Sequence, residues 1–326
     1  MARIIYASRN TRRAFGGVRN SERHVETLAR LGFDAHLLLP SVDSRHFSTR
    51  ELPILLAGTS FLPRPDDRIV LPEPWHRELD QLRGLPCRKL VFCQNHYLVF
   101  HGLAGAPDYA AYDIARVFAL SHEIAGFLAR VFGLGDVPVV PPVIDGDLFR
   151  PLPKLRQIAF MPRKMRRESP FFPPLFRARH PDLADVPWLA LDGMAEAEVA
   201  RRLGESAVFL SLSVDEGLGF PPLEAMSAET LVAGFHGEGG RDYASAENGD
   251  WVAPDDVIGA MDALARAVRL FDAASAATEA RRTAGRATAA RYSADAMERA
   301  LVAFWRDELA HPGPVGPRDD APRRTP

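Results

Sequence analysis

The sequence has few cysteines, few lysines and no long apolar run. Its 326 residues include two cysteines, Cys87 and Cys93, with no second pair and no metal-type spacing to histidine, so we expect buried, reduced thiols. It contains neither a run of about 18 apolar residues nor a charged segment that leads into an apolar one. We therefore expect no membrane span and no export, and a cytoplasmic location.

The sequence also lacks an excess of either positive or negative charge. The formal net charge is -2, and no basic segment is interleaved with aromatic residues as in nucleic-acid-binding modules. These features exclude a nucleic-acid partner. The exception is local: Arg9, Arg12, Arg13, Arg19 and Arg23 lie close together, so peripheral contact with an anionic lipid surface at the inner face of a membrane remains an alternative.

The first half of the chain alternates strands with helices. An apolar run at 3–8 leads into a loop that ends at Gly16 and Gly17, and apolar residues recur with helical spacing at 21–31, with the first serine as cap. Residues 36–39 predict a second strand. This βαβ order favours a parallel sheet covered by helices. Further elements are expected at 89–93 (strand), 115–120 (strand), 121–132 (helix) and 137–140 (strand), whereas the proline-rich stretch before 89 gives only weak strands.

A second alternation follows a proline-rich linker. Strands are expected at 157–161, 188–191, 208–211 and 231–235, with alanine-rich helices from 257 to 305. At this length two separate cores are expected. We therefore predict an α/β fold with domains at 1–150 and 151–310, of which the last helix is able to cross back to the first, and a disordered tail at 311–326.

The segment DEGLGFPPLEAM, residues 215–226, carries the densest chemistry. It follows an apolar strand, its glycines allow a tight turn, and its two prolines suit the first turn of a helix. A helix N-terminus favours an anion such as a diphosphate. Glu216 and Glu224 stand on either side of that turn, where carboxylates suit a polyhydroxylated ligand. The alternative is that Glu216 is solvated and Glu224 bonds a neighbouring loop.

The spacing Glu216-x7-Glu224 resembles the E-x7-E motif of the retaining GT-B glycosyltransferases, in particular family 4. The Gly16-Gly17 loop and the stretch VPVVPPVIDGDLFRP at 137–151 resemble further parts of that family, so the resemblance covers most of the chain. It implies the GT-B fold, two Rossmann-like domains that face each other across a cleft, which is the active site. It also implies transfer of a hexose from a nucleotide sugar with retention of configuration and without a metal ion or other cofactor.

The resemblance also assigns roles within the donor site. Glu216 contacts hydroxyls of the donor sugar, Glu224 contacts the ribose, and the backbone amides of Gly219 and Phe220 meet the diphosphate. Gly193 and Met194 lie at the loop that holds the base. Gly16 and Gly17 complete the donor side, and the nucleotide binds mainly to the C-terminal domain.

The cations of the family correspond to the segment IAFMPRKMRRES. Arg163 matches the arginine that neutralises the leaving phosphate, and the second cation is Lys164 or Arg167. Apart from Lys164, lysine occurs only at positions 89 and 154, so a lysine here is distinctive in this arginine-rich chain. The alternative is a solvated run of charge.

Asn95 and His96 follow the strand at 89–93 and are candidates for the acceptor side, the acceptor being a glycan, a lipid or a small molecule. His96 could equally be structural. Asp145 and Asp147 imitate a metal-binding D-x-D, but their place in the linker argues against that role. Two other functions stay open: a non-catalytic module that binds sugar nucleotides, and a nucleotide-sugar epimerase on the same architecture.

Overall fold

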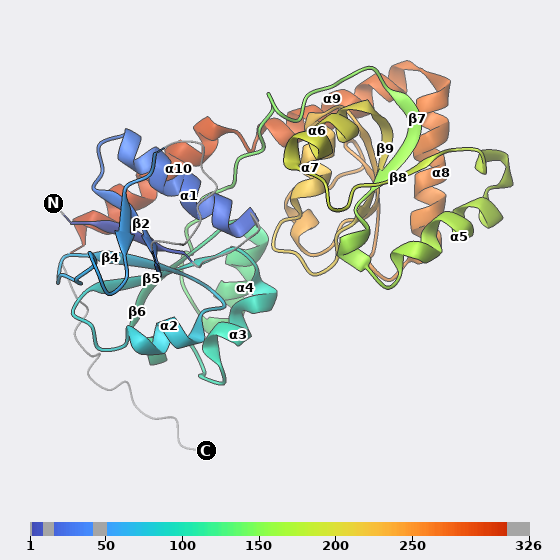
Figure 1. Cartoon of the computed structure of the whole chain (residues 1–326). Coiled ribbons are helices and arrows are strands. Elements are labelled where there is room, and N and C mark those ends of the chain that lie inside the picture. The colour runs from blue at the N-terminus through green and yellow to red at the C-terminus, as the bar shows by residue number, and fades with distance from the viewer. Residues whose placement is uncertain (1, 9–15, 42–50, 312–326) are drawn as a thin grey trace. The chain divides into compact units, whose positions relative to one another are not determined.

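The computed structural model describes residues 2–8, 16–41 and 51–311, which fall into two compact units. The first unit contains residues 1–141 together with 298–326, and the second contains residues 142–297. Each is built around one parallel sheet covered by helices (Figure 1). The expected arginine segment at Arg9, Arg12 and Arg13 and the expected tail after 311 lie outside the described residues.

In the first unit, six parallel strands lie in the order β3-β2-β1-β4-β5-β6, which is the Rossmann order. Both faces are covered, with α1 and α10 on one side and α2, α3 and α4 on the other (Figure 1). The elements are β1 (Ile4–Ala7), α1 (Gly16–Arg30), β2 (Ala35–Leu39), β3 (Ile54–Leu56), β4 (Arg68–Pro72), α2 (His76–Gln81), β5 (Arg88–Cys93), α3 (Val99–Leu103), β6 (Ile114–Ala119) and α4 (His122–Phe132).

Two expectations for this unit need correction. The helix expected from Ser21 begins at Gly16, and the Ser21 hydroxyl bonds the carbonyl oxygen of Gly17 within the helix and caps nothing. The strand expected at 137–140 is a single bridge between Ala119 and Val139, because Pro138 has no N–H to extend a ladder. The elements β3, β4 and α2 lie in the proline-rich region for which only weak strands are expected.

In the second unit, five parallel strands lie in the order β11-β10-β9-β7-β8. Helices α6, α7 and α9 lie on one side of this sheet and α5 and α8 on the other (Figure 1). The elements are β7 (Leu155–Phe160), α5 (Phe172–Arg179), β8 (Trp188–Ala190), α6 (Glu196–Glu205), β9 (Ser206–Leu212), α7 (Phe220–Ser227), β10 (Leu231–Phe235), β11 (Asp250–Val252), α8 (Val257–Ala273) and α9 (Ala276–Ala290). All seven residues of β9 are buried, as expected for a central parallel strand.

The turn between β9 and α7 depends on Gly219. Its φ of 82° is a left-handed conformation that glycine adopts without strain. A Cβ at this position would lie 3.1 Å from the Ser213 hydroxyl oxygen and 3.2 Å from that of Tyr243. The Tyr243 hydroxyl donates to the carbonyl oxygen of Gly219 at 3.1 Å, and the N–H of Gly239 donates to the carbonyl oxygen of Glu216 at 3.1 Å. The loop after β10 therefore holds the turn in place.

The last helix, α10 (Ala294–Ala310), joins the first unit from Glu298 onward. Its buried Glu308 accepts a hydrogen bond from Arg88 at 2.5 Å and lies 3.4 Å from Arg116 and 3.5 Å from Arg68. Trp305, on the same helix, donates its indole N–H to the Tyr6 hydroxyl. One buried carboxylate thus lies among guanidinium groups from β4, β5 and β6, of which Arg116 also pairs with Asp307 at 2.6 Å.

We expect Glu308→Gln to lower the free energy of unfolding by about 3–5 kcal/mol, because it leaves buried arginines without their counter-charge. The matched control is Glu298→Gln, also on α10, which removes the partly exposed partner of Arg30 of α1. It should lower the free energy of unfolding by at most about 1 kcal/mol. Urea unfolding followed by circular dichroism measures both, and equal losses would contradict the role of Glu308.

Gly219→Ala should destabilise the second unit more than Gly193→Ala does. Both glycines have positive φ, so both variants carry a backbone cost of about 1–2 kcal/mol. A Cβ at Gly193 meets nothing within 4 Å, whereas one at Gly219 crowds Ser213 and Tyr243, which adds about 1 kcal/mol or more. Equal unfolding midpoints for the two variants would show that the loop after β10 does not hold the turn.

Candidate functional site

The candidate site lies at the carboxyl ends of β7 and β9 in the second unit. These strands are neighbours, and the order of the sheet reverses between them, since β8 lies beyond β7 and β10 beyond β9. In open α/β sheets such a reversal leaves a crevice at the carboxyl ends, where ligands bind. Lys164 follows β7, Glu216 follows β9, and the two side chains form an ion pair there.

The basic segment after β7 begins with a short 3-10 helix, Pro162–Met165. Arg163 is exposed, and its contact among the described residues is with the sulfur of Met161 at 3.8 Å. Lys164 is 19% exposed. Burial and the neighbouring Arg163 charge lower the pKa of Lys164 to about 8, against the opposing effect of Glu224. Arg167 is exposed, so Lys164 is the cation that the fold brings to Glu216.

Glu216 and Glu224 lie on the two sides of the Gly219 turn. Glu216 is 21% exposed, and the Ser213 hydroxyl donates to its second oxygen at 3.5 Å. Glu224 is half-buried, one turn inside α7, and its charge acts on Lys164. The structure therefore brings Lys164, Glu216 and Glu224 into one charged cluster.

Helix α7 begins at Phe220 with no capping side chain among the described residues. Pro221 and Pro222 lie in its first turn, as expected, and neither has an N–H. The partial positive charge at this end of the helix therefore faces the cluster through few backbone donors, mainly those of Gly219 and Phe220. Such an end suits an anion.

The loop after β8 lies beside the basic segment. Asp192 comes within 3.9 Å of Arg166, and Gly193 follows it with a φ of 69°. Met194 is half-buried. The expected base-binding residues therefore belong to the same edge of the sheet as Arg163 and Lys164.

In the first unit, a similar reversal of strand order lies between β1 and β4. Gly16 and Gly17 open α1 after β1, and the carbonyl oxygen of Gly17 accepts a hydrogen bond from the Gln94 side chain at 3.0 Å. A Cβ at Gly17 would lie 3.3 Å from the same amide nitrogen. Asn20 donates to Gln94 at 2.9 Å, so the start of α1 is tied to the end of β5.

Glu73, directly after β4, was not identified from the sequence. It is buried, and its two oxygens accept the backbone N–H groups of Gln94 and Asn95 at 3.2 and 3.0 Å. Burial raises the pKa of Glu73 to about 7, although the backbone hydrogen bonds lower it. The signal that could have found it is an acidic residue at the carboxyl end of an apolar run, IVLP.

The proposed acceptor-side residues follow Gln94. Asn95 caps a 3-10 helix, His96–Leu98, by accepting the N–H of Tyr97 at 3.0 Å. His96 is 6% exposed, and its ring lies 4.4 Å from that of Tyr97 and 4.9 Å from that of Phe127. Its packing is therefore largely aromatic.

Two groups of residues outside these sites have plain structural roles. Asp145 accepts the N–H groups of Asp147 and Leu148 and so caps a turn in the linker. Cys87 and Cys93 are buried, and neither forms a disulfide.

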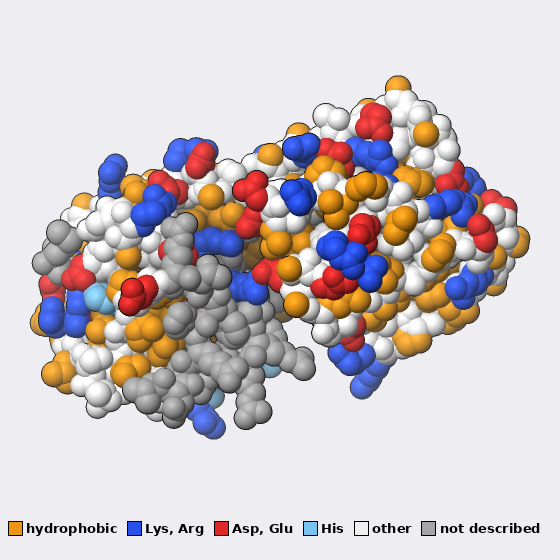
Figure 2. Space-filling view, turned by 45° about the horizontal axis from the view of Figure 1, so that its top comes forward, with side chains coloured by type: hydrophobic (Ala, Val, Ile, Leu, Met, Phe, Trp, Pro, Cys, Tyr) orange, Lys and Arg blue, Asp and Glu red, His pale blue; other side chains and the backbone are white. Residues whose placement is uncertain are grey.

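Surface charge on the second unit is mixed. On the face of this unit seen in Figure 2, basic and acidic side chains lie beside one another and do not gather into a patch of one sign. Many are paired, as in Arg156 with Asp272 and Arg179 with Asp262. In the part of the chain that the structure describes, no helix is long and apolar enough to span a membrane.

Comparison with known proteins shows a likeness in sequence to a glucosyltransferase. No family model matches the chain. An alpha-1,6-glucosyltransferase of Actinobacillus pleuropneumoniae serotype 7 (strain AP76) is 27% identical over 243 residues, which cover 72% of this chain and 71% of that protein.

Solved structures match almost the whole chain at low identity. The sucrose-phosphate synthase of Thermosynechococcus elongatus matches with a TM-score of 0.66 and 16% identity, over 95% of this chain and 100% of its own. Anabaena HepE in complex with UDP and glucose matches with a TM-score of 0.62 and 12% identity, over 94% and 99%. At such identities the structures show the shared fold. Together they show that this chain shares its fold, two Rossmann-like α/β units, with these proteins and is similar in sequence to a glucosyltransferase.

Proposed function

We propose that this chain transfers a sugar from a nucleotide-diphosphate sugar to an acceptor, with retention of configuration and without a metal ion. The observation that carries the proposal is the Lys164–Glu216 ion pair at the reversal of strand order, beside the uncapped start of α7. Cations and a helix N-terminus at the carboxyl ends of neighbouring strands suit a diphosphate. The two carboxylates suit the hydroxyl groups of a sugar and a ribose.

When the donor binds, it replaces the contact between Lys164 and Glu216 with contacts to itself. Its diphosphate takes the ammonium group of Lys164, which releases the Glu216 carboxylate to accept hydrogen bonds from the sugar. Glu224 holds the ribose, the amides of Gly219 and Phe220 meet the diphosphate, and Gly193 with Met194 borders the base. The complexes of Anabaena HepE with UDP and with UDP-glucose support this type of donor.

In the transfer step, the acceptor oxygen attacks the anomeric carbon from the side of the leaving phosphate. As that bond forms, the bond from the anomeric carbon to the diphosphate breaks, and a phosphate oxygen takes the acceptor's proton. Negative charge grows on the diphosphate, where Arg163, Lys164 and the α7 N-terminus stabilise it. This electrostatic contribution is worth several kcal/mol, about 2.7–4 for one well-placed donor. The cations replace a metal ion in this role.

A donor panel tests the function directly. The protein is incubated with UDP-, GDP- and ADP-sugars and candidate glycan, lipid and small-molecule acceptors, and nucleotide release is measured. Release that depends on an acceptor supports transfer, and the anomeric configuration of the product reports retention. Nucleotide binding without release would favour a non-catalytic module, and an isomerised sugar without acceptor would favour an epimerase.

Arg163→Ala should lower kcat by about 100- to 1,000-fold and change nucleotide affinity much less, because the charge it opposes develops during bond cleavage. The matched control is Arg177→Ala on α5, an exposed arginine outside the cluster, which should leave both unchanged. Steady-state kinetics and nucleotide titration separate the two quantities. Unchanged turnover in Arg163→Ala would remove this residue from the mechanism.

The pH dependence of kcat/KM should reflect the protonation of Lys164. Its pKa is about 8, so the ammonium form that binds phosphate is present below pH 8 and is lost as the pH rises through that value. We expect kcat/KM for the donor to fall above about pH 8, since this ratio reports the free enzyme. In Lys164→Arg the cation stays protonated, and the alkaline fall should disappear. The same fall in both proteins would assign it to another group.

A further inference from the structure

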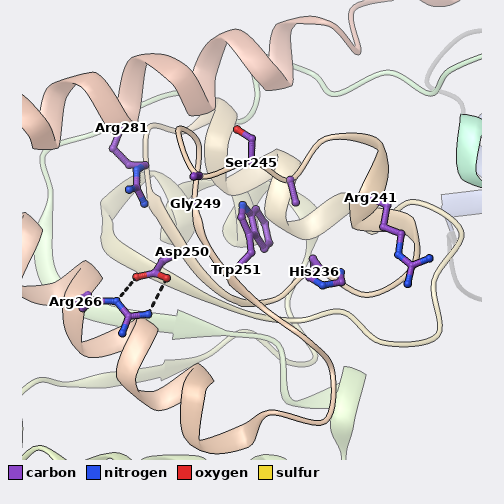
Figure 3. A pocket seen from close by; sticks show the side chains of 10 residues that line it. His236, Arg241, Ser245, Gly249, Asp250, Trp251, Arg266 and Arg281 are labelled. Atoms are coloured by element: carbon purple, nitrogen blue, oxygen red, sulfur yellow. Dashed lines mark hydrogen bonds and ion pairs between the residues drawn. The ribbon is translucent and has the colours of Figure 1, made fainter.

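The second unit carries an open depression of about 860 Å³ that includes none of the proposed donor residues (Figure 3). Its wall is formed by the connection between β10 and β11, from His236 to Gly249, and by Asp250 and Trp251 of β11. Arg266 of α8 and Arg281 of α9 complete it.

Three arginines, Arg241, Arg266 and Arg281, line this depression together with one acidic residue, Asp250. Its acid, Asp250, is fully engaged, because Arg266 donates to both of its oxygens at 2.7 and 2.9 Å. Arg241 pairs with Glu238 at 2.8 Å. Among the described residues Arg281 forms no ion pair; it is one of the charges that lower the pKa of Glu247, after a hydrogen bond from Ser245.

Trp251 presents a fixed indole in the depression. Its N–H donates to Asn248 at 2.9 Å, and its ring meets the edge of Tyr243 at a centroid distance of 5.9 Å. A Cβ at Gly249 would lie 2.5 Å from the indole, so glycine is required to seat the ring. Asn248 is itself held by Thr288 at 3.0 Å. The indole is therefore positioned before any ligand arrives.

Trp251 and Arg281 both line this depression. In Figure 3 the indole of Trp251 lies between the side chains of Arg281 and His236. An aromatic face suits the apolar face of a sugar ring, and a guanidinium group binds phosphate or carboxylate with two parallel hydrogen bonds. Few polar groups around an aromatic surface are typical of small-molecule sites.

We propose that this depression is a second ligand site of the protein, for a sugar that bears an anionic group. The sugar ring lies on Trp251, and the phosphate or carboxylate is held by Arg281. The site is separate from the donor cluster, whose cations are Arg163 and Lys164. Its ligand is therefore an anionic glycan or a sugar phosphate that binds without taking the place of the nucleotide sugar.

Titration of the full chain with glucose 6-phosphate and with glucuronic acid, read by calorimetry, tests the site. Glucose and inorganic phosphate serve as partial probes. We expect at least one anionic sugar to bind about tenfold or more tightly than either partial probe. Arg281→Gln and Trp251→Leu should each weaken that binding about tenfold or more, and saturating UDP should leave it unchanged.

Two controls separate this site from the donor cluster and from general charge effects. Arg177→Gln removes an exposed arginine of the same unit, and Lys164→Met disables the proposed donor site. Both should bind the anionic sugar as the unaltered chain does. Because Arg281 is a half-buried helix residue, its variant should fold even if Trp251→Leu does not, and thermal unfolding checks this.

The proposal is overturned by any of three results: no saturable binding of either anionic sugar, full binding in Arg281→Gln, or loss of binding in Lys164→Met or with UDP. The last result would place the sugar in the donor cluster. None of these results bears on acceptor-dependent nucleotide release, so the proposed function stands or falls separately.

Discussion

The Lys164–Glu216 ion pair is the interaction on which the candidate donor site depends. It joins the residue that follows β7 to the residue that follows β9, two strands that pair in parallel from Ile158 with Val208 to Phe160 with Leu210. Each charge is partly buried, so each needs the other until a ligand replaces it. An anionic ligand that carries hydroxyl groups offers both replacements at once.

The geometry around this pair is fixed by the backbone of the turn and by the loop after β10. Gly219 takes a left-handed conformation, and Tyr243 and Gly239 bond the turn from the loop after β10. The same loop forms the wall of the depression that contains Trp251. One connection between β10 and β11 therefore supports the proposed donor turn and shapes the second proposed site.

In the first unit, hydrogen bonds to a buried carboxylate and from an amide side chain hold the loop at the reversal of strand order. At its own reversal of strand order, Glu73 accepts the backbone N–H groups that follow β5, and Gln94 ties that segment to the start of α1. No cation pairs with Glu73 among the described residues, which agrees with its raised pKa. These hydrogen bonds hold a polar loop at the carboxyl ends of the strands in the first unit.

The sequence by itself determined the alternation of strands and helices outside the proline-rich stretch before residue 89. It also determined the turn after β9 and the proline-started helix, with Glu224 one to two turns inside. These features follow from local periodicity and from the backbone preferences of glycine and proline, which are properties of short segments. Tertiary structure alone decided that β7 and β9 are neighbours, that Lys164 reaches Glu216 while Arg167 stays exposed, and that Glu73 is buried beneath Asn95. It also decided that 137–140 forms one bridge and that α1 already includes Gly16 and Gly17, ahead of the Ser21 expected as its cap. The order of strands in a sheet and the partners of a charged side chain depend on residues far apart in the chain, so no local pattern contains them.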